Sequence, residues 1–258
     1  SGSNFGAGSE LDVVATYGPS GTRYTAIECA VSEDHTAIQC TTATGIGATH
    51  KWLLTIAGVV SDLSTPTTSY KAPVVTDVSG PGAEDATTEG GEVVYLAGTS
   101  FGIASFEPPV VQYGPASDPG RYTATGCRVA SAHSQLECST GEGTGTDLHW
   151  RVTVDGQTSE PSEQATWYAR PMVFQYSGPG AGDANTRGGQ DVLIEGRNFG
   201  KESSRIDLVT YGIDDLTEFT ATECVVHTPH TYLLCKTGEG AGVGLSWSVT
   251  VDGQVSGA

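Results

Sequence analysis

Short runs of alternating apolar and polar residues recur along this chain. The runs "WRVTV" at 150–154 and "WSVTV" at 247–251 each alternate a large apolar residue with a polar one, as half-buried strands do. An Asp-Gly pair follows both runs, at 155–156 and 252–253, and Ala57-Gly58 stands at the equivalent place near the start. Asp-Gly between alternating runs is a strong signal for a two-residue hairpin turn. The pattern therefore predicts antiparallel strand pairs.

The middle of the chain holds seven runs of this kind, separated by turn signals. The predicted strands are 73–78, 92–97, 109–113, 122–129, 135–139, 149–154 and 157–168. No stretch has the period or the composition of a helix. Seven short strands predict an all-β domain of the sandwich type.

The same sequence pattern occurs three times. Two cysteines recur at identical spacing, and a tryptophan follows each second cysteine after twelve positions. The three sets are Cys29, Cys40 and Trp52; Cys127, Cys138 and Trp150; and Cys224, Cys235 and Trp247. The period is 97 to 98 residues, and a fixed period marks one structural unit per copy.

The copies predict three domains, which span residues 1–72, 73–170 and 171–258. Gly2 occupies the place of Gly98, so the first copy lacks the counterpart of the opening strands at 73–96. The third copy lacks the counterpart of 162–170. We expect three tandem immunoglobulin-like β-sandwich domains, the first without its opening strands and the third without most of its last strand.

Composition and charge narrow the class of protein. With 35 glycines, 12 prolines and 16% charged residues, the chain lacks the Ala, Glu, Lys and Leu-rich stretches of helical proteins. The formal charge of -18 argues against nucleic acid or an anionic membrane surface as partner, because such partners require clustered Lys and Arg. The acidity fits weak calcium binding or, as we favour, a soluble extracellular surface.

The cysteines indicate an oxidising compartment. Three repeated pairs without a CxxC motif or a histidine cluster favour disulfides over a metal site. Each pair closes a short hairpin, and the bond stabilises it by about 3 kcal/mol in the chain-entropy model. No apolar run in this chain is long enough to cross a bilayer. We expect a secreted or cell-surface protein, whole or a piece of a larger one.

Candidate catalytic residues find no support in the pattern. His35, His133 and His230 recur one repeat apart, so they cannot converge on one site, and we interpret them as turn residues that bond local backbone. The "TGEGTG" and "TGEGAG" segments lack the following Gly-Lys-Ser/Thr of a phosphate loop. The sequence therefore predicts a non-enzyme without a metal or another cofactor.

Hydroxyl residues gather in the last strands of the first two copies. The chain has no N-glycosylation sequon, so any covalent glycan would be O-linked. The O-glycan candidates are Ser64, Thr65, Thr67, Thr68, Ser159, Ser162 and Thr166. The alternative is an edge strand kept soluble by its hydroxyls and prolines.

The order of short motifs in each copy resembles the IPT/TIG domain. The motifs are Pro-x-Val, Ser-Gly-Pro-Gly, Thr-x-Gly-Gly, Gly-x-x-Phe-Gly, Val-x-Tyr-Gly, Cys, His-Thr/Ser-x-x-x-Cys and Trp-x-Val-Thr-Val. The likeness covers the whole second copy and the others except their missing ends. The cysteine pair with its intervening histidine is similar to extracellular, fibrocystin-like tandem arrays. The resemblance implies an immunoglobulin-like fold that serves adhesion, recognition or architecture, with no catalytic residues.

A sandwich without its opening strands has an unpaired sheet edge and an exposed apolar groove. Leaving several hundred square ångströms open would cost about 10 kcal/mol, comparable to the stability of a whole domain. The residues expected at these assembly edges are Phe5, Val13, Tyr17, Leu53 and Ile56 in the first copy and Gln254, Val255 and Ser256 in the third. We expect neighbouring chains or a longer array to complete both ends.

Because both ends need to be completed, we expect the partner to be another copy of the chain. A head-to-tail contact that does not close produces a filament, so we expect an extracellular, O-glycosylated fibre or surface-array subunit. One alternative is an adhesion or receptor ectodomain that binds a protein or carbohydrate through loops at the sandwich ends. An accessory module of a secreted glycoside-active enzyme is a third.

Overall fold

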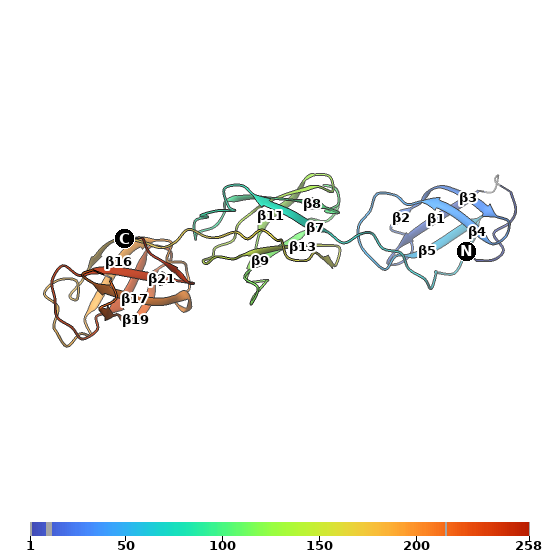
Figure 1. The fold of residues 1–258 in the computed structure, drawn as a ribbon. Helices are drawn as coiled ribbons and strands as arrows, with labels where there is room; N and C mark the ends of the chain where they lie inside the picture. Colours follow the sequence, from blue (N-terminus) through green and yellow to red (C-terminus); the bar gives the residue numbers. More distant parts are fainter. Residues whose placement is uncertain (1, 9–11, 215, 258) are drawn as a thin grey trace.

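The computed structural model describes residues 2–8, 12–214 and 216–257 and arranges them as three β-sandwich modules in a row (Figure 1). Module 1 contains strands β1–β6, module 2 contains β7–β14 and module 3 contains β15–β22. The only helical segment in these ranges is a 3₁₀ turn, η1, at Ser203–Arg205. The all-β fold of tandem immunoglobulin-like sandwiches, expected from the sequence, is confirmed.

Module 2 has two four-stranded antiparallel sheets. Its strands are β7 (Val74–Ser79), β8 (Val93–Thr99), β9 (Val110–Gly114), β10 (Tyr122–Thr123), β11 (Thr125–Ser131), β12 (Gln135–Ser139), β13 (His149–Val154) and β14 (Gln157–Thr158). The strand orders are β11-β12-β8-β7 and β10-β9-β13-β14. Leu96 and Leu136 lie opposite each other on β8 and β12, and both are fully buried against Trp150 in the core. The alternation read from the sequence thus places one apolar face of each sheet inside.

The last predicted strand of module 2, 157–168, is wrong beyond its second residue. β14 ends at Thr158, and only isolated bridges follow, at Thr166 and Tyr168. The side-chain hydroxyls of Ser159 and Ser162 accept the backbone N–H groups of β13 there. Serine hydroxyls thus take the place of the carbonyl acceptors of a regular ladder, while the backbone N–H groups of Ser159 and Ser162 still donate to β13.

Module 3 repeats the plan of module 2. Its strands are β15 (Met172–Ser177), β16 (Asp191–Arg197), β17 (Ile206–Gly212), β18 (Phe219–Thr220), β19 (Thr222–Thr228), β20 (Tyr232–Lys236), β21 (Ser246–Val251) and β22 (Gln254–Val255). They form sheets in the orders β15-β16-β20-β19 and β18-β17-β21-β22. Val192 and Ile194 of β16 are fully buried, as is Leu233 of β20.

Module 1 has only half of its second sheet. Its strands are β1 (Val13–Gly18), β2 (Tyr24–Thr25), β3 (Ile27–Glu33), β4 (Ala37–Thr41), β5 (Lys51–Ile56) and β6 (Val59–Val60). The sheet β2-β1-β5-β6 matches its counterparts, but β3 pairs with β4 alone. Among the described residues, no strand lies beside β4 where β8 lies beside β12.

Each module has a disulfide at the same place. Disulfides join Cys29 to Cys40, Cys127 to Cys138 and Cys224 to Cys235. Each links the two strands of one hairpin: β3 to β4, β11 to β12 and β19 to β20. On the other sheet of each module a tyrosine ring stacks on the tryptophan ring of the neighbouring strand, with centroids 4.0 Å apart for Tyr113 and Trp150. This stack joins β9 to β13 within one sheet and adds to the stabilisation from area burial.

Candidate functional site

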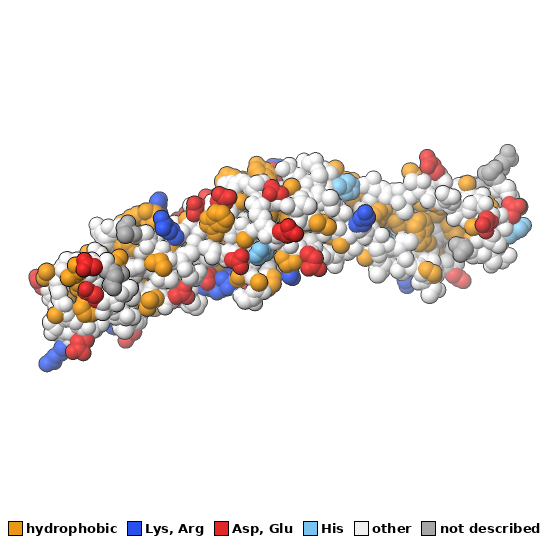
Figure 2. Space-filling model, viewed as in Figure 1, with side chains coloured by type: hydrophobic (Ala, Val, Ile, Leu, Met, Phe, Trp, Pro, Cys, Tyr) orange, Lys and Arg blue, Asp and Glu red, His pale blue; other side chains and the backbone are white. Residues whose placement is uncertain are grey.

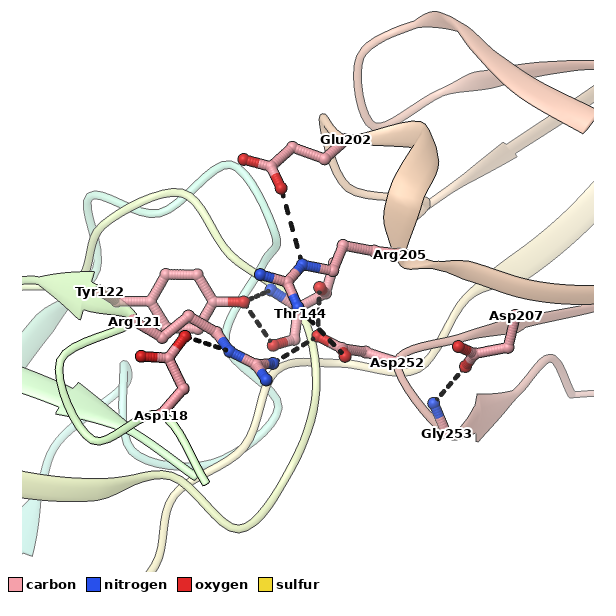
Figure 3. Close-up of polar contacts among 9 residues, drawn as sticks. All are labelled: Asp118, Arg121, Tyr122, Thr144, Glu202, Arg205, Asp207, Asp252 and Gly253. Carbon is pink, nitrogen blue, oxygen red and sulfur yellow. Dashed lines mark hydrogen bonds and ion pairs between the residues drawn. The ribbon is translucent and has the colours of Figure 1, made fainter. Parts of the chain in front are cut away.

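The junction of modules 2 and 3 centres on Asp252, in the tight turn between β21 and β22. Asp252 has a φ of 47°, as the Asp-Gly hairpin signal requires. Its carboxylate lies 3.0 Å from Nη1 of Arg121 and accepts a 2.9 Å hydrogen bond from the Thr144 hydroxyl (Figure 3). Nη1 of Arg205 approaches to 3.9 Å from the side of module 3. One carboxylate thus binds groups from both modules.

The contact between Arg121 and Asp252 is shielded from solvent. The side chains of Arg121 and Asp252 are 14% and 17% exposed, so the ion pair is largely withdrawn from water. Burial alone would lower the pKa of Arg121, but the Asp252 carboxylate raises it above its ordinary value. The guanidinium therefore stays charged, and the pair acts as a fixed ionic contact between modules.

A second ionic contact lies at the rim of the same junction. Nζ of Lys201 in module 3 lies 2.8 Å from the Glu142 carboxylate in module 2. This lysine lowers the pKa of the Glu142 carboxyl. Both groups are well exposed, so the pair contributes less than the Arg121–Asp252 pair.

The junction of modules 1 and 2 has the same construction. Nη1 of Arg23 lies 2.6 Å from the Asp155 carboxylate. Nε2 of Gln157 donates to the Tyr70 carbonyl over 3.1 Å, and Gln254 donates in the same way to the Tyr168 carbonyl over 2.8 Å. The two junctions therefore repeat an arginine–aspartate pair and a glutamine–carbonyl bond.

Glycine makes room for each aspartate. Gly47 lies against Asp155 with a φ of 95°, and a Cβ there would come within 1.9 Å of the carboxylate. Gly145 has a φ of 96° and lies against Asp252, where a Cβ would come within 3.0 Å. A side chain at either position would displace the aspartate carboxylate from its place and would strain a backbone with φ near 95°.

The three recurrent histidines are turn residues, as expected. His35, His133 and His230 have φ angles of 62°, 60° and 68°. The expected bond to local backbone is wrong for the ring of His230, because its Nδ1 lies 2.9 Å from the Thr88 hydroxyl in module 2 and its Nε2 lies 3.7 Å from Glu142. The hairpin tip of module 3 therefore rests on module 2.

The outward-facing ends of the row carry different residues. Ala57 and Val59 stand in module 1 where Asp155 and Gln157 stand in module 2. In module 3, Glu218 stands where Arg121 stands in module 2. The contact of the internal junctions therefore cannot be repeated between the outer ends of two copies.

The unpaired edge of β4 borders an apolar groove of about 600 Å³. Ile38 and Cys40 line it from β4, and Trp52 and Leu54 line it from β5. The counterparts of Ile38 in modules 2 and 3, Leu136 and Leu233, are fully buried, whereas Ile38 is only partly buried. Hydrophobic side chains gather on the exposed face of module 1 in Figure 2.

The expected edge residues of module 1 fall into three environments. Phe5 lines the groove, and Val13 and Ile56 are partly buried at the paired ends of β1 and β5. Tyr17 is wrong as an edge residue, because it is 1% exposed and stacks on Trp52. Leu53 is also wrong: it alternates with the groove-lining residues of β5 and lies near Gly21 on the other face.

The expected edge of module 3 is wrong at two of its three residues. Gln254 belongs to the internal junction, where its amide donates to module 2. Ser256 is satisfied within module 3, because its backbone N–H and its hydroxyl bond Val249. Val255 remains exposed on the short strand β22.

Module 3 has a groove of its own, about 640 Å³ in volume. It lies beside Tyr211 and Trp247, between the loop at 180–186 and the loop at 237–245. In module 2 the segment that ends in Tyr168 fills the corresponding space.

The candidate glycan sites differ in accessibility. Ser159, Ser162 and Thr166 are wrong as glycan sites, because they are at most 6% exposed and their hydroxyls bond the backbone or Trp150. Their module 1 counterparts lie nearer to solvent. Ser64 and Thr68 bond Trp52, whereas the side chains of Thr65 and Thr67 are exposed and make no hydrogen bond within the described part of the chain.

Metal binding and membrane spanning find no support in the described residues. No group of three or more His, Cys, Asp or Glu residues in the described ranges could hold a metal ion. None of the helical structure described here is long and apolar enough to span a membrane.

The sequence carries signals for the junction pairs that none of the predicted sites includes. Arg-Tyr recurs at 23–24 and 121–122, and Asp-Gly-Gln recurs at 155–157 and 252–254. Neither the Arg-Tyr nor the Asp-Gly-Gln pattern occurs at the outer ends of the row. This difference is the further signal that would have assigned the two patterns to junctions.

Comparison with known proteins gives only weak likenesses. No protein-family model matches the chain, and no curated protein matches it. Among solved structures it is similar to SGBP-B from a xyloglucan utilization locus of Bacteroides uniformis, with 16% identity, a TM-score of 0.28, and 72% of this chain and 48% of that chain covered. The chain thus spans about half of that protein.

Two further solved structures resemble larger parts of the chain. The Escherichia coli adhesin FdeC shares 15% identity at a TM-score of 0.29, over 96% of this chain and 84% of the adhesin. The plexin A4 extracellular region shares 12% identity at a TM-score of 0.30, over 96% of this chain and 25% of plexin. Likenesses at these TM-scores assign no function, so the case for one comes from the chain's own geometry.

Proposed function

We propose that the protein is a non-enzymatic extracellular structural protein, the subunit of a head-to-tail fibre or surface array. In this proposal domains 1–72, 73–170 and 171–258 form a stiff rod, and strands from neighbouring chains complete the outer modules. The three disulfides favour an extracellular or surface location. The repeated junctions support stiffness, because each fixes two modules through an ion pair and a glutamine bond.

The open edge of β4 carries the proposal. Modules 2 and 3 cover the equivalent edges with β8 and β16, which place Leu96 and Ile194 fully buried in their cores. A strand added to β4 in the same antiparallel register would bring two alternate apolar side chains over Trp52 and Leu54. Strand addition supplies backbone hydrogen bonds for affinity and side-chain pockets for specificity.

Contacts between copies would then differ from contacts within a copy. An internal junction uses arginine against aspartate, whereas the outer ends offer Glu218 and Ala57. Strand addition needs neither charge, so it can join copies without the arginine–aspartate pair. The proposed array therefore has two kinds of joint.

O-linked glycan is proposed at Thr65 and Thr67. Both threonines are exposed and lie near Pro66 in the segment that follows β6. A sugar at either hydroxyl would break no bond within module 1. Glycan there would border the β4 groove, whose lining includes Pro66 and Thr67.

Sedimentation and electron microscopy over a dilution series test the proposal. Filaments that grow with concentration are expected, and Ile38→Lys should shorten or abolish them by placing a charge in the groove. Thr22→Lys is the matched control, because Thr22 is exposed in a loop outside the groove. Single particles of the unaltered chain at every concentration would contradict the proposal and favour a receptor ectodomain.

A further inference from the structure

Two modules pair the hydroxyls of two tyrosines in the same way. In module 2 the hydroxyls of Tyr113 and Tyr168 lie 2.6 Å apart, and Tyr168 donates to the Gly141 carbonyl over 2.7 Å. In module 1, Tyr17 and Tyr70 form the same pair. In each pair the second tyrosine comes from the extended segment that leads into the next module.

That extended segment is also held by its backbone. The N–H of Trp167 donates to the Ala83 carbonyl, the N–H of Ala86 donates to the Trp167 carbonyl, and the N–H of Ala169 donates to the Ala86 carbonyl over 2.8 Å. The indole of Trp167 also lies within hydrogen-bond distance of the Asp85 carboxylate, at 3.3 Å. The loop at 83–86 is therefore a short docking rail for one extended segment.

Module 3 has the rail and the first tyrosine, and its groove stands open. Ala184 is exposed, although its counterpart Ala86 is 2% exposed. Leu245 is partly exposed, although its counterpart Leu148 is buried. The hydroxyl of Tyr211 donates to the Gly238 carbonyl over 3.3 Å, as that of Tyr113 does to Gly141, and no tyrosine hydroxyl in the described residues bonds it in turn.

We propose that this groove of module 3 binds an extended peptide segment that presents a tyrosine to Tyr211, with a basic residue one or two positions after it. The two internal occupants share this chemistry, since Lys71 follows Tyr70 and Arg170 follows Tyr168 by two residues. Asp183 lies at the groove wall in the place of Asp85, whose carboxylate in module 2 faces the indole of Trp167, the residue before the tyrosine. The inference rests on the proposed function, in that it names the chemistry of the strand that completes module 3.

Two side chains now lie where the segment would enter. The Tyr176 hydroxyl donates to the Leu245 carbonyl over 3.0 Å, whereas in module 2 Thr166 bonds the Leu148 carbonyl. The Phe219 ring lies over Gly240, where a Cβ would meet it within 2.4 Å, while at Gly143 the neighbour is the Tyr168 ring. Binding would displace both side chains, which makes them reporters of the site.

A synthetic peptide copying residues 164–171, capped at both ends, tests the proposal on the full chain. We expect saturable binding that shifts the amide resonances of Ala181, Ala184 and Gly240 and leaves those of module 1 in place. Tyr168→Ala in the peptide should abolish binding. Tyr211→Phe in the chain should weaken it roughly fivefold to tenfold, the worth of one hydrogen bond. Tyr113→Phe is the matched control and should leave the affinity unchanged, because its groove is filled.

The proposal is overturned if the peptide does not bind, if the Tyr168→Ala peptide binds equally well, or if the shifts map outside module 3. A second arm guards against weak affinity: a chain extended after Ala258 by residues 162–170 presents the segment at high effective concentration. Slower amide exchange at Ala184 in that chain supports the proposal, and unchanged exchange overturns it. Filaments without peptide binding would refute this inference alone, whereas binding without filaments would refute the fibre alone.

Discussion

Nη1 of Arg121 and the carboxylate of Asp252 lie 3.0 Å apart across the junction of modules 2 and 3. Arg23 and Asp155 repeat the relationship at the preceding junction, at 2.6 Å. Both aspartates occupy the first position of a two-residue hairpin turn, so the turn that ends one sheet also aims a carboxylate at the neighbouring module. The conformation of these turns therefore helps to set how successive modules of the rod are placed.

Asp252→Asn should loosen the rod at one joint. The variant removes the charge that balances a largely buried guanidinium, which should cost about 1–2 kcal/mol of junction stability. Small-angle X-ray scattering should then report a broader distribution of shapes with a shorter mean length. Asp118→Asn is the matched control, because Asp118 pairs with the same Arg121 within module 2 and is more exposed. An unchanged scattering curve for Asp252→Asn would show that the ion pair does not set the junction.

Removing one disulfide should destabilise one module. The double variant Cys127→Ala and Cys138→Ala frees the hairpin β11–β12 and should lower the free energy of unfolding of module 2 by about 3 kcal/mol. Hydrogen exchange against urea resolves the modules and measures the change. Modules 1 and 3 keep their own bonds and serve as internal controls. Equal loss in all three modules would mean that they unfold as one unit.

Strong alkali should unfold module 2 through its buried tyrosines. Burial raises the pKa of Tyr113 from 10.0 to about 12, and burial also raises the pKa of Tyr168. The folded state holds these protons more tightly than the unfolded state does. The resulting stability, about 3 kcal/mol for Tyr113, is full below pH 10 and is lost as the pH rises towards 12.

Absorbance at 295 nm, recorded together with circular dichroism, tests this alkaline transition. Ionisation of Tyr113 should coincide with loss of β-structure above pH 10. Tyr168→Phe removes one partner of the buried pair and should destabilise module 2 by about 1 kcal/mol. Ionisation of Tyr113 near pH 10 with the sheets intact would refute the account.

Glycan, where the producing cell adds it, should reside in module 1. We expect an intact mass above that of the bare polypeptide, and loss of the excess in the double variant Thr65→Ala and Thr67→Ala. Ser159 and Ser162 should carry none, because their hydroxyls are buried and bond the backbone of β13. A natural protein whose mass equals the bare chain would exclude the modification.

The sequence predicted the sheets and staples because these depend on local signals that occur in triplicate. Alternation placed Trp150 and Val152 inside, and equal spacing paired Cys127 with Cys138. The burial of individual edge residues could not be predicted, because it depends on which face of each sheet lies against the core. Tyr17 keeps its cover from Trp52 and Tyr70 although its module lacks a strand pair.

The contacts between modules escaped prediction for another reason. A pairing such as Gln254 with the Tyr168 carbonyl joins residues 86 positions apart, and although each residue recurs one repeat away, no local pattern links the two. Only the relative placement of two folded sandwiches brings them together. The same holds for His230 and Thr88, which meet across the junction.

Backbone hydrogen exchange along β4 tests the central claim most directly. In the dispersed chain, the amides of residues 37–41 should exchange faster than those of β12 and β20, which are paired on both sides. In assembled material the β4 amides should become as protected as those of β12, because a strand from a neighbour covers them. Exchange at β4 that stays fast in the assembled state, or a chain that never assembles, would contradict the account.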